Sequence, residues 1–156
     1  MNDNKLKTAV WEADRHLSVL ESALADWQNF TVVDLAGLEK DPNQLRILDQ
    51  LLFRFSKLQD AIGQRLVPAT LSALFEIYED WGMIDRLNRL EKLGYLDVNN
   101  WFRWREIRNR LSHEYPDNEG VRFAAILAAI TAGAELAEGY QHWRAMLIKK
   151  CLSLIS

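Results

Sequence analysis

A chain of 156 residues, of which 49% are hydrophobic and 26% charged, has the composition and size of a soluble protein with a single core. Its formal charge of −3 argues against a protein that coats nucleic acid by bulk electrostatics, so any contact with nucleic acid must be local. We therefore predict one domain over residues 1–156, built around several of the six Trp residues.

The sequence shows no sign of export or of membrane insertion. The first residues mix charged and apolar side chains, which does not fit a signal peptide. The least polar stretch, from Phe123 to Ala137, meets Glu135 before it reaches the roughly 20 residues that cross a bilayer, and it predicts a core helix. The single cysteine, Cys151, cannot form an internal disulfide. A cytoplasmic protein without membrane contact is the expectation.

The spacing of apolar residues predicts an all-α protein. Only seven Gly and three Pro interrupt the chain, and no long stretch alternates polar and apolar residues as a strand would. The first helix is expected to begin after Asp3 or Asn4 and to end near Asn29. One or two helical turns around Leu35 and Leu38 are expected to follow.

A second long helix is predicted from the pair Asp41 and Pro42, which has the form of an N-cap followed by proline in the first turn. This helix extends to about Asp80. Pro68 lacks a backbone donor, so a bend or a break is predicted there. Gly82 then opens a turn.

The second half of the chain is predicted to contain three more helices. The first buries Ile84, Leu87 and Leu90 and ends at Gly94, a residue favoured at helix C-termini. The next begins after a cap at Asp97 and continues to about residue 115, because Pro116 disfavours helical backbone before it. A final long helix is predicted over residues 118–154.

The helix before Pro116 carries an arginine where an apolar residue is expected. Trp101, Trp104, Arg108, Leu111 and Tyr115 recur at alternating spacings of three and four residues, which places them on one stripe. An unpaired guanidinium is costly to bury. Arg108 must therefore meet an anion, line a cleft or lie in an interface.

The same helix carries a polar arc beside that stripe, formed by Arg105, Asn109, Ser112 and His113. It contains four arginines although the protein as a whole is acidic, and such a local excess can recruit a phosphate backbone. The alternative is a salt-bridged surface helix, the usual explanation of an arginine-rich helix, and the position of Arg108 on the apolar stripe is what argues against it. His113 can serve as acid or base near neutral pH, or simply interact with the C-terminal end of the helix dipole.

The combination of Arg108, Asn109, His113 and Tyr115 resembles the R-N-x-x-x-H-x-Y motif of HEPN domains. Its last part is similar to the H-x-Y extension of HepT-like toxins, which are encoded beside minimal nucleotidyltransferases. The stretch from Arg54 to Leu66 also resembles an early core helix of these toxins. The resemblance implies an antiparallel bundle of four to five helices with the motif near the end of a late helix.

The resemblance also implies a metal-independent endoribonuclease that acts as a homodimer and is the toxin of a toxin–antitoxin pair. His113 would be general base or general acid, Arg108 would hold the scissile phosphate and Asn109 would orient either group. Arg105 and Ser112, on the same arc, would contact the RNA. No metal or other cofactor is expected.

Tyr115 would be the residue to which the nucleotidyltransferase antitoxin attaches adenylate, although a tyrosine that packs under Pro116 explains its position equally well. Two other interpretations of the chain remain open. One is a non-catalytic substrate-binding partner of a nucleotidyltransferase. The other is a purely structural helical dimer.

Overall fold

The computed structural model describes residues 2–113 and 115–155, with side chains described for residues 4–113 and 115–150. The prediction for Cys151 therefore falls outside the described side chains. Within these residues the protein is all-α, with six helices and no strand. In chain order the elements are α1 (Asn2–Trp27), α2 (Leu35–Lys40), a continuous helix made of α3 (Pro42–Ala61), the π-helical turn η1 (Ile62–Leu66) and α4 (Val67–Ala73), then α5 (Met83–Lys92), α6 (Val98–Leu111) and α7 (Glu119–Ile155).

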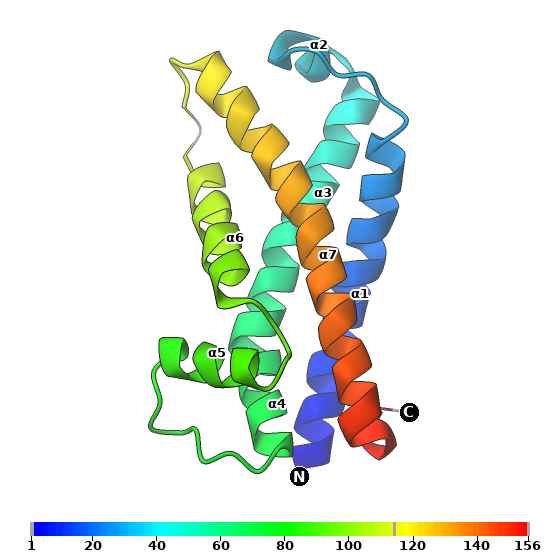
Figure 1. Cartoon of the computed structure of the whole chain (residues 1–156). Helices are drawn as coiled ribbons and strands as arrows, with labels where there is room; N and C mark the ends of the chain where they lie inside the picture. Colours follow the sequence, from blue (N-terminus) through cyan, green and yellow to red (C-terminus); the bar gives the residue numbers. More distant parts are fainter. Residues whose placement is uncertain (1, 114, 156) are drawn as a thin grey trace.

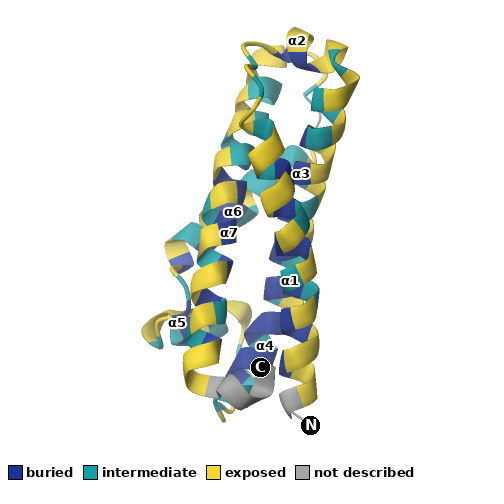
Figure 2. Ribbon diagram, turned by 90° about the vertical axis from the view of Figure 1, so that its right-hand side faces the viewer, coloured by how far each residue is buried: buried dark blue, intermediate teal, exposed yellow. Residues whose placement is uncertain are grey.

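The helices form an elongated bundle. The long helices α1, α3 and α7 pack against one another, and α6 packs against α7. Figure 1 shows α1 and α6 running in one direction, α3 and α7 running in the other, and the short α5 lying across the bundle near α4. Buried residues lie on the inward sides of these helices (Figure 2), and the largest of them include Phe55, Tyr95, Tyr140 and Trp143.

Helix α7 belongs to this core. By length and composition, its segment from Glu119 to Lys150 could also cross a membrane, a test that core helices of soluble proteins pass as well. Here it packs against α1, α3 and α6, and it buries Leu136, Tyr140 and Trp143. The core helix predicted around Phe123–Ala137 is thus present.

Local signals in the sequence correctly located several helix ends. The carboxylate of Asp41 accepts hydrogen bonds from the backbone of α3, and that of Asp97 accepts one from Asn100 N at 3.0 Å. Gly94 has a positive φ of 91°, and the bond from Tyr95 N to Leu90 O, 2.9 Å long, completes the turn that ends α5. The turn at Gly94 and the cap at Asp97 set where α6 begins.

Two predictions about the middle of the chain were wrong, namely where the second long helix ends and which way Ile84 faces. The helix that begins at Pro42 ends at Ala73 and not near Asp80, because Phe75 adopts a left-handed φ of 62°. It continues through Pro68, since the π-helical turn η1 just before it accommodates the missing donor. Ile84, which was predicted to face inward, is 60% exposed, whereas Leu87 and Leu90 are buried as predicted.

A candidate nucleic-acid site at the C-terminal end of α6

The first half of α6 is anchored in the core by two tryptophans. Trp101 and Trp104 are buried, and the Trp104 indole donates to Glu135 Oε1 at 3.2 Å. Gln59 Nε2 on α3 donates to the Trp104 carbonyl oxygen at 3.1 Å. Hydrogen bonds from Arg103 and then from Trp104 lower the pKa of Glu135, against the effect of its partial burial. The buried tryptophans therefore fix the position of α6 and of the polar residues that follow Trp104.

Arg108 meets an internal carboxylate. Its Nη1 donates to Asp60 Oδ1 at 2.5 Å and its Nη2 to Asp60 Oδ2 at 3.0 Å, and each side chain is 27% exposed. The sequence left three environments for Arg108: an anion, a cleft or an interface. The structure shows an anion, the Asp60 carboxylate on α3. The placement of Arg108 is thus accounted for within the chain and does not by itself require an external phosphate.

Asp60, Arg105 and Arg108 form a cluster in which Asp60 does not engage every N–H donor of the two arginines. Arg105 Nη1 lies 3.8 Å from Asp60 Oδ1, so two guanidinium groups share one carboxylate and the cluster carries a formal charge of +2 − 1 = +1. A guanidinium has five N–H donors, of which the bidentate pair with Asp60 uses two on Arg108. An additional anion could therefore bind at this cluster without displacing Asp60.

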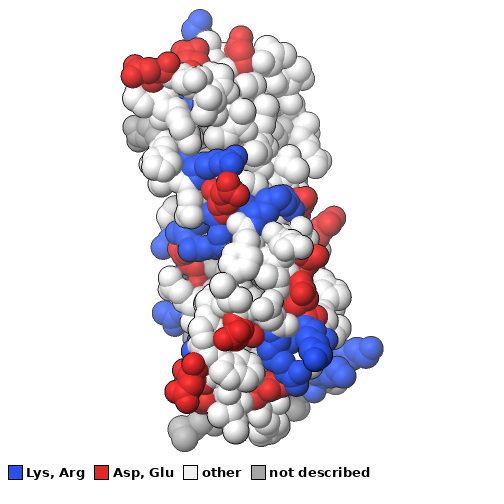
Figure 3. All heavy atoms as spheres, turned by 60° about the vertical axis from the view of Figure 1, so that its left-hand side comes forward, with Lys and Arg blue, Asp and Glu red and all other residues white. Residues whose placement is uncertain are grey.

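The rest of the face around α6 is balanced in charge. Arg103 pairs with Glu135 at 2.7 Å and Arg110 with Glu106 at 2.7 Å. Figure 3 shows basic and acidic groups interspersed on this side of the molecule. The arginine-rich composition of α6 therefore does not produce a continuous basic surface, and any RNA contact would depend on the few groups that keep donors available.

Helix α6 ends earlier than its sequence predicts. The last helical residue is Leu111, and Ser112 Oγ donates to the Asn109 carbonyl oxygen at 2.6 Å. This side-chain bond competes with continuation of the backbone ladder. Tyr115 follows with a left-handed φ of 46°. The prediction that Tyr115 continues the apolar stripe of α6 was therefore wrong.

His113 and Tyr115 lie together beyond the helix end. Their ring centroids are 6.0 Å apart, His113 is exposed and Tyr115 is half-buried. Both line a depression of about 620 Å³ between α2, α3 and the beginning of α7, together with Leu111, Phe53 and Arg122. Arg108 is not among its lining residues. The structure thus brings His113 and Tyr115 together but gives Arg108 different surroundings in the same chain.

The remaining predicted site residues are accessible. Asn109 and Ser112 are exposed, and the Asn109 carbonyl oxygen accepts from both the Ser112 hydroxyl, at 2.6 Å, and the Ser112 backbone N–H, at 3.2 Å. Arg105 is partly exposed and belongs to the cluster around Asp60. Among the described residues, no group of three or more His, Cys, Asp or Glu side chains could hold a metal ion.

Two residues near this site had not been singled out in the sequence. Asp60 lies in the segment Arg54–Leu66, but its pairing with a residue 48 positions away depends on how α3 and α6 pack. Arg122, near the beginning of α7, forms an ion pair with Glu39 and lines the depression beside His113. A cationic side chain thus lies on the His113 side as well.

No family model, no curated protein and no solved structure matches this chain. Any functional assignment therefore depends on the residues and their arrangement.

Proposed function

We propose that this protein is a HEPN-type bundle of four to five antiparallel helices that cleaves RNA without a metal, as the toxin of a toxin–antitoxin pair in the cytoplasm. The observation that carries the proposal is the motif at the end of α6, where a positioned arginine precedes an exposed histidine. Asp60 orients Arg108 through two hydrogen bonds and leaves other N–H groups for a phosphate. His113 is accessible to solvent.

In the proposed reaction the ribose 2′-hydroxyl attacks the adjacent phosphorus. His113 takes the hydroxyl proton as the O2′–P bond forms, and the resulting imidazolium returns it through a water molecule to O5′ as the P–O5′ bond breaks. Arg108 stabilises the extra negative charge on the phosphoryl oxygens. The products are a 2′,3′-cyclic phosphate and a 5′-hydroxyl, so atoms and protons balance without a further reagent.

The proposed site is composite and requires two chains. Within one chain Arg108 faces Asp60 on α3, whereas His113 lies past the helix end and lines the same depression as Tyr115 and Arg122. A twofold axis near the end of α6 would bring Arg108 of one protomer to His113 of the other. Phe102 on α6 is 42% exposed and offers an apolar contact for such an interface. We therefore propose a homodimer.

Control of the toxin is proposed to act on Tyr115. A nucleotidyltransferase antitoxin would join the Tyr115 phenolic oxygen to the α-phosphorus of ATP and release pyrophosphate. Tyr115 is half-buried in the connection between α6 and α7, with its ring centroid 6.0 Å from that of His113. Adenylate at this position would place a bulky anion where the RNA phosphate is proposed to bind, and so block cleavage.

The test is an RNA cleavage assay in excess chelator. We expect wild-type protein to cleave, and His113→Ala and Arg108→Ala to lose about 100-fold or more in rate, the scale of an acid–base or charge-stabilising group. Arg110→Ala is the matched control on the same helix, because that side chain is paired with Glu106 and solvent-exposed. Equal activity in the Arg108 and Arg110 variants, or cleavage that stops with chelator, would contradict the proposal.

A second function is favoured by one specific observation. Asp60 engages both terminal nitrogens of Arg108, as expected if the arginine only joins α6 to α3. The protein would then be a non-catalytic binding partner of a nucleotidyltransferase. Wild-type protein would form a stable complex with that enzyme and would show no RNA cleavage, whereas the ribonuclease must cleave by itself.

A further inference from the structure

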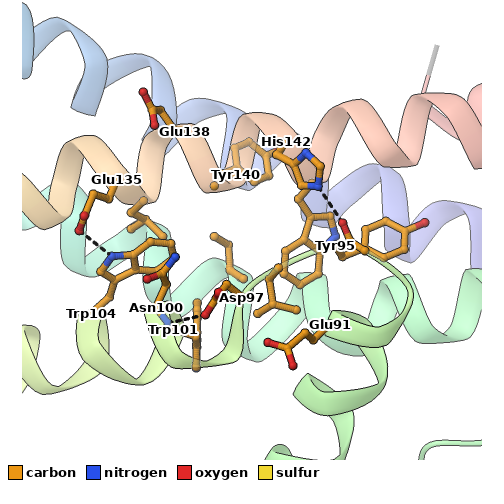
Figure 4. A pocket seen from close by; sticks show the side chains of 16 residues that line it. Glu91, Tyr95, Asp97, Asn100, Trp101, Trp104, Glu135, Glu138, Tyr140 and His142 are labelled. Carbon is orange, nitrogen blue, oxygen red and sulfur yellow. Dashed lines mark hydrogen bonds between the residues drawn. The ribbon is translucent and has the colours of Figure 1, made fainter.

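The depression beside His113 presents an aromatic ring to solvent. Phe53 on α3 lines this depression of about 620 Å³ and is 54% exposed. The larger cavity at the start of α6 is different, because the indole and phenol rings that surround it in Figure 4 are packed in the core and at most 6% exposed. A flat ligand therefore has a ring to stack on beside His113, whereas the rings of the larger cavity are closed to it.

The depression begins about one helical turn from the arginine cluster. On α3, Ser56 lines the depression and Asp60, four residues further on, holds Arg108. On α6, Leu111 lines the depression and Arg108 precedes it by three residues. One turn of helix advances about 5.4 Å. A phosphate bound by the remaining N–H donors of Arg105 and Arg108 would therefore leave a base of the same strand within reach of the depression.

Positive charge surrounds the exposed ring. The Arg54 guanidinium carbon lies 5.6 Å and the Lys57 ammonium nitrogen 5.5 Å from the centroid of the Phe53 ring. Arg122 contributes a third cation to the wall formed by α7. Proteins that hold single-stranded nucleic acid combine these two features, since the cations attract the phosphates and the ring stacks on a base. These surroundings favour a nucleotide over a purely apolar ligand.

One carboxylate in the depression is available to a ligand. Glu39 and Asp49 both line it, and Glu39 is paired with Arg122. Asp49 is exposed and has no hydrogen bond or ion pair with any described residue. It precedes Phe53 by four residues, so the two side chains are neighbours on the same face of α3. A base that stacks on Phe53 would therefore turn one edge toward Asp49.

The base that best fits this carboxylate is guanine. A carboxylate only accepts hydrogen bonds, and its two oxygens can accept two parallel ones. The Watson–Crick edge of guanine offers two adjacent donors, N1–H and the N2 amino group. Adenine and cytosine each offer one amino group beside an acceptor, and uracil offers one N–H between two acceptors. Guanine can therefore make two hydrogen bonds with Asp49 where each other base makes one.

We propose that the depression holds the base next to the scissile phosphate and selects guanine. Phe53 stacks on the base, and Asp49 accepts hydrogen bonds from its N1–H and its N2 amino group. This inference rests on the proposed ribonuclease function, which places the RNA phosphate at Arg108 and His113, and it adds which RNA the protein prefers.

Oligouridylates with 2′-fluoro groups cannot be cleaved and provide the test of binding. Each contains one guanine, hypoxanthine or adenine in the middle, and fluorescence anisotropy measures its dissociation constant. Hypoxanthine has the N1–H of guanine but lacks the N2 amino group. We expect the guanine oligomer to bind about tenfold more tightly than the other two. Equal binding of the three oligomers would overturn the proposal.

Two variants assign the preference to its residues. Asp49→Asn keeps the shape of an exposed side chain and should remove the preference for guanine, whereas Phe53→Leu should weaken all three oligomers severalfold. Asp26→Asn and Phe75→Leu are the matched controls, because both residues are exposed and neither lines the depression. Both controls should bind as the wild type does. A preference for guanine that persists in Asp49→Asn, or is lost equally in Asp26→Asn, would refute the assignment.

Cleavage of unmodified RNA in excess chelator separates this inference from the function on which it rests. We expect the cuts to lie next to guanosine. Cuts without a base preference would overturn the guanine site and leave the ribonuclease intact. Guanine-selective binding without any cut would contradict the ribonuclease, and the depression would remain a guanine-binding site.

Discussion

The ion pair between Arg108 and Asp60 should make a measurable contribution to stability. It joins α6 to α3 by two hydrogen bonds, of 2.5 and 3.0 Å, between side chains that are each 27% exposed. Exposed ion pairs contribute about 0.2–1 kcal/mol, and breaking a fully buried pair costs about 3–5 kcal/mol. At this exposure we expect a coupling free energy of about 1–2 kcal/mol. Loss of either partner should lower the melting temperature by about 2–8 °C.

A double-mutant cycle measures this coupling directly. Asp60→Ala, Arg108→Ala and the double variant would be unfolded in urea, and the double variant should be less destabilised than the sum of the single variants. Glu106 and Arg110 form the matched pair on the exposed side of α6, at 65% and 58% exposure, where about 0.5 kcal/mol or less is expected. A coupling below about 0.3 kcal/mol between Asp60 and Arg108 would contradict the expected contribution of this pair to stability.

Three further predictions concern the fold. Burial, and then the Arg54 guanidinium 2.8 Å from its Nδ1, lower the pKa of His16 from its ordinary 6.5, so the folded chain binds this proton less readily than the unfolded chain. The His16 contribution to the free energy of unfolding is therefore complete above pH 6.5 and is lost as the pH falls through the lowered pKa. Urea unfolding at several pH values will detect this loss of stability, and His16→Gln should abolish it. Gly94→Ala places a side chain at a φ of 91° and should cost about 1–2 kcal/mol in thermal unfolding. Asp41→Ala removes a helix cap and should cost about 1 kcal/mol, whereas Asp41→Asn should cost little.

The sequence predicts those parts of the fold that depend on neighbours in the chain. Asp41, Asp97 and Gly94 stop or start helices through contacts within a few residues, and each was located correctly. The end of α6 was misplaced although it is also local. Pro116 limits how far the helix can extend, but the hydrogen bond from Ser112 to the Asn109 carbonyl ends it at Leu111.

The candidate site could be predicted only in part, because its partners come from distant segments. The position of Arg108 on an apolar stripe predicted that it meets an anion, lines a cleft or lies in an interface, and it meets the Asp60 carboxylate. Its partner could not be chosen, since Asp60 is 48 residues away and meets Arg108 only after α3 and α6 pack. In the same way, Arg122 on α7 lines the same depression as His113, which no local spacing reveals.

The central claim is that Arg108 of one chain and His113 of another act on the same phosphate. Mixing the inactive variants Arg108→Ala and His113→Ala tests it, because a mixed dimer contains one complete site and one that lacks both groups. With random exchange of subunits, half of the dimers are mixed, so cleavage in chelator should return to about a quarter of the wild-type rate. No recovery in a mixture shown to exchange subunits, or no cleavage by wild-type protein, would contradict the claim.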